Sequence, residues 1–198
     1  MLCECGSLCF SDIRVVFDME NEILPGYTLH PVTEEEFMTL YNERESLYFA
    51  GFEQTDLIGD VSDRDREQFA LRHKAFTGGE RFQWFIQHKG DIIGWTLAQQ
   101  DDPITLLMRN TAVDPTHRRA GVYTALLAFV VAFAREHGYQ RITSTHSATN
   151  NAILIPKLKA DFVISGMHVD ERFGVMVHLT HFLYPHRRSV VERRVRGF

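Results

Sequence analysis

The chain has 198 residues, of which 44 % are hydrophobic and 24 % charged, and its formal net charge at pH 7 is −5. This composition excludes a disordered, collagen-like or coiled-coil protein, and it provides no overall electrostatic attraction to nucleic acid. The length is sufficient for one domain with a well-packed core.

Apolar runs are too short to predict a membrane protein. The longest, residues 125–134, has ten residues, about half of what a helix needs to cross a bilayer. The first residues include Glu4 and no basic segment ahead of an apolar one, so a secretory signal is not predicted. We therefore expect a cytoplasmic protein that does not bind membranes.

All three cysteines, Cys3, Cys5 and Cys9, lie near the N-terminus. Their odd number argues against a disulfide framework. Their spacing matches none of the usual structural zinc sites, and a distant histidine would have to be the fourth ligand. We expect free thiols on an N-terminal strand and no metal, with a zinc site as the less favoured alternative.

Apolar spacings typical of strands and of helices alternate along the chain and predict a mixed α/β protein. In the first half, strands are predicted at residues 8–17 and 27–31, helices at 34–47 and 62–76, and a hairpin at 82–86 and 92–98. In the second half, strands are predicted at 105–113, 141–145, 162–169 and 175–183, and helices at 121–137 and 150–159. Thr33 and Glu36 have the spacing of a capping box for the first helix.

Charge and aromatic residues are unevenly distributed. Residues 34–67 carry eleven acidic residues against three arginines, and residues 187–196 carry five arginines against one glutamate. Solvated helix faces explain the first segment and a mobile tail the second, although the tail could also bind an acidic partner. For a group of four aromatic residues we expect core packing rather than a ligand pocket. These are Phe82, Trp84, Phe85 and Trp95.

The segment with the clearest chemistry joins a strand to the longest apolar helix. The strand ends at Val113, Pro115 interrupts it, and Arg118 and Arg119 precede Gly121 at the start of the helix. A helix N-terminus presents unpaired N–H groups and partial positive charge, and a glycine there lets a phosphate approach the backbone. The segment therefore predicts an anion site. The alternative is a basic turn in which Gly121 serves only the backbone angles.

The sequence of residues 118–123, Arg-Arg-Ala-Gly-Val-Tyr, resembles the Q/R-x-x-G-x-G/A signature of the GCN5-related N-acetyltransferase (GNAT) superfamily. It follows a strand ending in Val-Asp-Pro, as in that family, and the order of elements agrees over roughly residues 27–183. The resemblance implies a GNAT-like α/β fold with a central twisted mixed sheet of about seven strands and about four flanking helices. Residues 1–26 would form an N-terminal extension with a strand, and residues 184–198 a basic tail.

The resemblance also implies that acetyl-CoA, or coenzyme A, binds to this chain. In the family, the strand before the signature pairs with pantetheine, the signature loop holds the pyrophosphate, and an asparagine contacts the cofactor arm. Carried over, pantetheine would pair with Ala112 and Val113, and the arm would contact Asn150. The pyrophosphate would lie on Arg118, Arg119, Ala120, Gly121, Val122, Tyr123 and Thr124.

Three departures from the family pattern concern the chemistry. Tyr123 stands where the signature usually has Gly or Ala, so its side chain must point away from the loop. The position of the family's thiolate-protonating tyrosine falls near Lys157. Where the family carries its acidic general base, this chain has Leu107, Arg109 and Asn110.

A histidine is the natural replacement for the missing base, because its pKa lies near 7. His146, just past a strand that would face the thioester, is the leading candidate, and a histidine bonded to a loop backbone is the simpler alternative. His168, Asp170 or an ordered water are weaker options. His178 and His181 are three residues apart on one strand, so they face opposite sides and form no simple metal pair.

Two functions remain open. One is acyl-CoA-dependent, and most simply acetyl-CoA-dependent, N-acylation of a primary amine that attacks the thioester directly. The oxyanion would be held by a backbone N–H near Val113. The acceptor would be a small-molecule or peptide amine, and the acidic segment 34–67 would favour a cationic one by steering. The alternative is a catalytically weak CoA-binding or protein-interaction module. The oligomeric state stays open, a homodimer included.

Overall fold

The structure of the chain is a computed structural model that describes residues 20–49, 62–75 and 78–196. The strand expected at residues 8–17 and the three cysteines lie outside these ranges.

The described residues form one eight-stranded sheet in the order β1-β2-β3-β4-β5-β6-β8-β7. The strands are β1 (Asn21–Leu24), β2 (Tyr27–Pro31), β3 (Arg81–His88), β4 (Asp91–Asp102), β5 (Thr105–Val113), β6 (Arg141–Ser147), β7 (Val163–Asp170) and β8 (Gly174–Phe182). The helices are α1 (Glu34–Tyr48), α2 (Asp63–Ala75), α3 (Val122–Glu136), α4 (Asn151–Lys159) and α5 (Pro185–Arg196), with a 3-10 turn η2 (Pro115–His117). The mixed α/β architecture predicted from the sequence is confirmed, with one strand and one helix more than expected.

The two additional elements lie at the ends of the described chain. β1 pairs with β2 in an antiparallel hairpin, where Glu22 accepts a hydrogen bond from the backbone N–H of Gly26. The expectation of a mobile C-terminal tail is wrong for residues 185–196, which form α5. Arg188 stabilises this helix, since it forms ion pairs with Asp161 and, one turn along, with Glu192.

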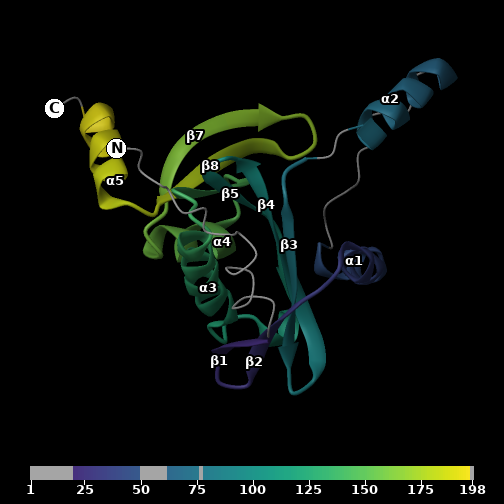
Figure 1. Cartoon of the computed structure of the whole chain (residues 1–198), viewed down its shortest axis with the longest axis horizontal. Coiled ribbons are helices and arrows are strands. Elements are labelled where there is room, and N and C mark those ends of the chain that lie inside the picture. The colour runs from purple at the N-terminus through teal and green to yellow at the C-terminus, as the bar shows by residue number, and fades with distance from the viewer. Residues whose placement is uncertain (1–19, 50–61, 76–77, 197–198) are drawn as a thin grey trace, which may run out of the picture.

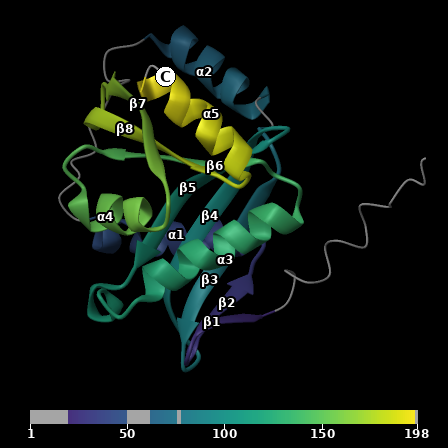
Figure 2. The ribbon, with the colours of Figure 1, turned by 90° about the vertical axis from the view of Figure 1, so that its left-hand side faces the viewer.

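Helices cover both faces of the sheet, with α3 and α4 on one side and α1 on the other (Figure 1). Figure 2 shows α3 lying across the strands. The core under α3 includes the fully buried Leu106, Leu126 and Ile142. The aromatic residues pack as predicted, because Trp84 contacts Phe129 and Phe133 of α3. Trp95 is wholly buried and packs against Phe37 and Tyr48 of α1.

β5 and β6 form the one parallel pair among the described strands, and their pairing is short. It joins residues 105–107 to residues 141–143. Arg141 closes this end, because its guanidinium bonds the carboxylate of Asp102 at 2.9 Å and the hydroxyl of Thr105 at 2.6 Å. Beyond it, residues 108–113 of β5 remain paired to β4, and residues 144–147 of β6 to β8, but the described structure pairs them with nothing on the facing edges. We call this opening the β5–β6 split and its closed end, at Met108 and Ser144, the vertex.

Candidate active site

A short ordered turn follows the open end of β5. The carboxylate of Asp114 accepts a hydrogen bond from the backbone N–H of Thr116 at 2.8 Å and another from the Thr116 hydroxyl. These bonds, that of the Thr116 hydroxyl first, hold the pKa of Asp114 below its usual value. The backbone N–H of Asp114 donates to the carbonyl of Ile93 on β4 at 2.7 Å. These bonds fix the turn to the sheet, and the following residues lead to the N-terminus of α3.

Residues 118–124, which we call the α3 turn, form an open concave backbone. Arg119 and Gly121 both adopt left-handed conformations, with φ of 65° and 86°. Gly121 is the N-cap of α3, and no side chain caps the helix there. Among the described residues, the atom nearest to a Cβ placed on Gly121 is a methyl carbon of Leu24, at 4.0 Å. Among the described residues, the start of α3 therefore has no side-chain cap and leaves the Cβ side of Gly121 open, and an uncapped helix N-terminus is the arrangement that binds phosphate.

The side chains of the α3 turn leave this space free. Arg118 donates from Nε to the carbonyl of Val113 at 2.9 Å, which holds its guanidinium beside the end of β5. Tyr123 packs against the core under α3, and burial raises its pKa. Its side chain is therefore directed away from the turn, as the departure from the signature required. Arg119, Ala120 and Thr124 are exposed, whereas the Val122 side chain is buried.

The other residues expected to hold the cofactor lie on, or shortly after, the two strands of the split. Val113 is the last residue of β5, and the side chain of Ala112 is buried in the cluster under α1. Asn150 follows β6 as the N-cap of α4, and its side chain makes no capping hydrogen bond. The fold thus brings β5, the α3 turn and Asn150 to the same opening.

Lys157 occupies the vertex, and it is the most unusual residue of the site. Its side chain is wholly buried, and its Nζ donates to the Ser144 hydroxyl at 2.8 Å and to the Met108 sulfur at 3.3 Å. The ammonium also lies 4.4 Å from the centre of the Phe162 ring. Burial lowers the pKa of Lys157 to about 7. From the sequence, Lys157 was singled out only because it stands near the position where the family has a tyrosine. The signal for its burial was its place three residues after Leu154, on the apolar side of the predicted helix.

His146 lies on β6 two residues after Ser144, and therefore on the same face of the strand. Its Nε2 is buried and has no hydrogen-bond partner among the described residues. Burial, and secondarily the charge of Lys157, lowers the pKa of His146 to about 3. The assignment of His146 as general base stays a prediction. Its low pKa counts against it, because a base works best when its pKa lies near the working pH.

The weaker candidates for acid or base lie elsewhere. His168 stacks on His178 at the outer strands β7 and β8, and Asp170 accepts backbone N–H groups of the turn that follows it. His178 is exposed, whereas His181 is buried and bonded to the carbonyl of Ala160, as expected for opposite faces. No group of three or more potential metal ligands occurs among the described residues.

The β5 positions that lack an acid are engaged in structural bonds. Arg109 donates to the side chain of Gln99 at 3.0 Å, and Asn110 accepts from the Trp95 indole at 2.8 Å. Neither group can abstract a proton from an amine at neutral pH. The third position, Leu107, carries no titratable group.

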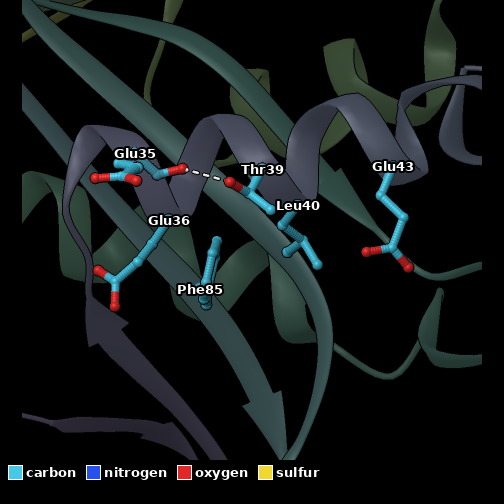
Figure 3. A pocket seen from close by; sticks show the side chains of 6 residues that line it. All are labelled: Glu35, Glu36, Thr39, Leu40, Glu43 and Phe85. Carbon is cyan, nitrogen blue, oxygen red and sulfur yellow. Dashed lines mark hydrogen bonds between the residues drawn. The ribbon is translucent and has the colours of Figure 1, made fainter.

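The acidic segment contributes an open pocket beside α1 (Figure 3). It has a volume of about 360 Å³ and is lined by Glu35, Glu36, Thr39, Leu40, Glu43 and Phe85. Phe85 belongs to β3, which is two strands from β5 in the sheet order. The pocket therefore lies outside the split, with β4 and β5 between them in the sheet order. None of the described helices is both long and apolar enough to traverse a bilayer.

A family model and several solved structures are similar to this chain. A model of the acetyltransferase (GNAT) family matches residues 18–156. A GNAT family acetyltransferase from Elizabethkingia anophelis with acetyl-CoA bound has 18% identity and a TM-score of 0.54, covering 80% of this chain and 99% of that one. An IAA acetyltransferase from Bacillus cereus has 16% identity and a TM-score of 0.57, covering 79% and 99%. A spermidine/spermine N-acetyltransferase from Vibrio cholerae has 11% identity and a TM-score of 0.57, covering 85% and 99%.

The search of curated proteins finds no significant match. At these identities the structural likenesses show the fold, whereas the family match extends over most of the chain. It includes the α3 turn, both edges of the split and most of α4. The chain belongs to the GNAT family of acetyltransferases, whose acyl donor is acetyl-CoA.

Proposed function

We propose that this protein transfers the acetyl group of acetyl-CoA to a primary amine that attacks the thioester directly. The observation that carries the proposal is the open, uncapped α3 turn at the mouth of a split between two unpaired strand edges. The turn offers N–H groups and arginine charge to the pyrophosphate, and the β5 edge offers backbone groups to pantetheine. An acyl chain on the cofactor would then extend toward the vertex.

The transfer needs few protein groups. The amine nitrogen attacks the carbonyl carbon, a backbone N–H near Val113 stabilises the oxyanion, and the carbon–sulfur bond breaks as the amide forms. In our proposal, the acceptor is a small-molecule or peptide amine, and a cationic one is favoured. The support is the negative face of α1, where Glu35, Glu36 and Glu43 surround the pocket. One protein of similar fold is named for spermidine and spermine, which are cationic amines.

A matched pair of glycine variants tests the proposal. Gly121 and Gly138 flank the two ends of α3 at φ of 86° and 75°, and apart from their chain neighbours no atom of the described residues lies closer than 4.0 Å to a new Cβ at either. Both substitutions with glutamate therefore carry the same backbone strain and the same charge. We expect Gly121→Glu to weaken CoA binding at least about 100-fold in calorimetry, because a carboxylate would face the phosphate. Gly138→Glu should bind within about threefold of the unmodified protein, since it lies at the opposite end of the helix.

Thiol release from acetyl-CoA is then measured with polyamines, monoamines and peptides as acceptors. Release that depends on an amine supports the transferase. CoA binding without any acceptor-dependent release would identify the alternative, a CoA-binding module. Unchanged CoA affinity in a folded Gly121→Glu variant would remove the site assignment itself.

A further inference from the structure

The β5 edge of the split carries an arginine whose charge is not neutralised. The strands β5, β6 and β8 contain two arginines and no aspartate or glutamate. One of the two, Arg141, forms an ion pair with Asp102 at 2.9 Å, at the closed end of the split. The other, Arg109, is exposed, and no carboxylate of the described residues forms an ion pair with it. Its guanidinium is therefore available to an anion from outside the protein.

A β-bulge sets the direction of Arg109. The pairing with β4 skips this residue, because Met108 and Asn110 are opposite consecutive residues of β4. Bulges occur next to active sites, where they redirect a side chain. Ala98 belongs to the core under α3, so its neighbour Gln99 lies on the opposite face of the sheet, and Arg109 bonds Gln99 there at 3.0 Å. Arg109 therefore lies on the face that α1 covers.

The helices determine from which side an acceptor reaches the split. α3 and α4 cover one face of the sheet (Figure 1). On the other face α1 packs over β4, where Phe37 and Tyr48 contact Trp95. The split begins one strand further along the sheet, at β5. An acceptor amine therefore approaches the split on the α1 face, beside Arg109.

We infer that Arg109 binds a carboxylate of the acceptor, so that the substrate is an amino acid and not a simple amine, an inference that rests on the proposed function. The planar guanidinium has N–H donors beyond the one that bonds Gln99, and their fork matches the two oxygens of a carboxylate. Such charge-assisted bonds are among the strongest that a site can offer to a ligand. With no acidic residue on β5, β6 or β8, nothing on these strands repels the carboxylate.

The spacing along β5 favours a basic amino acid. Arg109 lies four residues before Val113, beside which the oxyanion is proposed to form, and an extended strand covers about 13 Å over that distance. The long side chain of Arg109 can shorten the gap, but the α-amino group is attached to the same carbon as the carboxylate. A side-chain amine, as in lysine, lies at the far end of a flexible chain. Lysine is also net cationic, in agreement with the acidic face of α1.

The test compares lysine with cadaverine, which is lysine without its carboxylate. Initial rates of thiol release are measured with each acceptor at saturating acetyl-CoA. If the negative face of α1 alone selected the acceptor, the doubly charged cadaverine would be the better substrate. We expect kcat/KM to be at least about 30-fold higher for lysine, because only lysine can bond the guanidinium.

Arg109→Gln should remove this preference. We expect the KM for lysine to rise about 30-fold with little change in kcat, and the kinetics with cadaverine to change less than about threefold. Arg194→Gln is the matched control, because it removes the same charge from an exposed position on α5 and should change either KM less than about twofold. The Kd for CoA should stay within about twofold in both variants, which also shows that they are folded. Arg109→Lys keeps the charge without the fork and should lower the preference about fivefold.

The outcomes separate this inference from the proposed function. If no amine supports turnover by the unmodified protein, both fail. If amines are acetylated but cadaverine is as good a substrate as lysine, the carboxylate site is wrong while the transferase stands. The same conclusion follows if folded Arg109→Gln keeps the preference for lysine. The comparison of the two acceptors uses the unmodified protein, so it decides the matter even if a variant does not fold.

Discussion

The α3 turn and the vertex lie at opposite ends of the β5–β6 split and are built in opposite ways. The turn consists of seven consecutive residues, and its N-cap, Gly121, has no side-chain capping bond among the described residues. At the vertex, side chains from β5, β6 and α4 meet in a buried cluster, and Met108 and Lys157 are 49 residues apart. A backbone site tolerates changes of side chain, which is why Tyr123 is compatible with it. A site made of buried side chains depends on the identity of each one.

This contrast predicts that the two regions respond differently to pH. The largest expected effect is on the free energy of unfolding. The pKa of Lys157 is about 7 in the folded protein and 10.5 in an ordinary setting. Between these values the unfolded chain binds more protons than the folded one, so stability rises with pH in this window. From pH 7 to pH 9 the free energy of unfolding should increase by about 2 kcal/mol relative to Lys157→Met.

Urea unfolding of both proteins at the two pH values measures this difference. The cysteines and the other titrating groups are common to both proteins, so their contributions to the pH dependence cancel in the difference. An equal response of the two proteins to pH would mean that Lys157 is not desolvated, and the contrast between the regions would disappear.

The same contrast explains what could be predicted from the sequence. β5 was expected at residues 105–113 and lies at Thr105–Val113, and the capping box of Thr33 and Glu36 is present at the start of α1. Gly121 was also expected at the start of the apolar helix, and it is the N-cap of α3. These features depend on neighbours within a few positions of the chain, so period, capping and glycine placement reveal them.

What could not be predicted depends on long-range packing. β1 has four residues, too few for a periodic pattern, and α5 is stabilised by the ion pair of Arg188 with Asp161. The burial of Lys157 follows from Met108 and Ser144, which reach it from two other elements. His146 was singled out because imidazole has a suitable pKa. The neighbours that lower this pKa became visible only in the folded chain.

A smaller effect is expected in the α3 turn. Arg118 joins the turn to β5 through the bond from its Nε to the carbonyl of Val113. Lysine has the same charge but no second donor at that place, so Arg118→Lys should weaken CoA binding about fivefold. Arg119→Lys is the matched control, because Arg119 is exposed and no bond to β5 is described for it. It should change the Kd less than about twofold. If neither variant changes the Kd measured by calorimetry, charge alone acts there.

The smallest effect is expected for His146→Gln, which tests whether His146, two residues beyond the vertex on β6, acts as a general base. With a pKa of about 3, the imidazole is neutral throughout the working range and takes up almost no proton. Glutamine is also neutral and keeps an N–H donor, so kcat should change less than about threefold and the pH profile should keep its shape. A fall of about 100-fold with loss of the acidic limb would contradict this expectation and establish His146 as the base. Its pKa would then have to rise when the substrates bind; proton loss from Lys157 would remove the smaller of the two causes that lower it, while burial, the larger one, would remain.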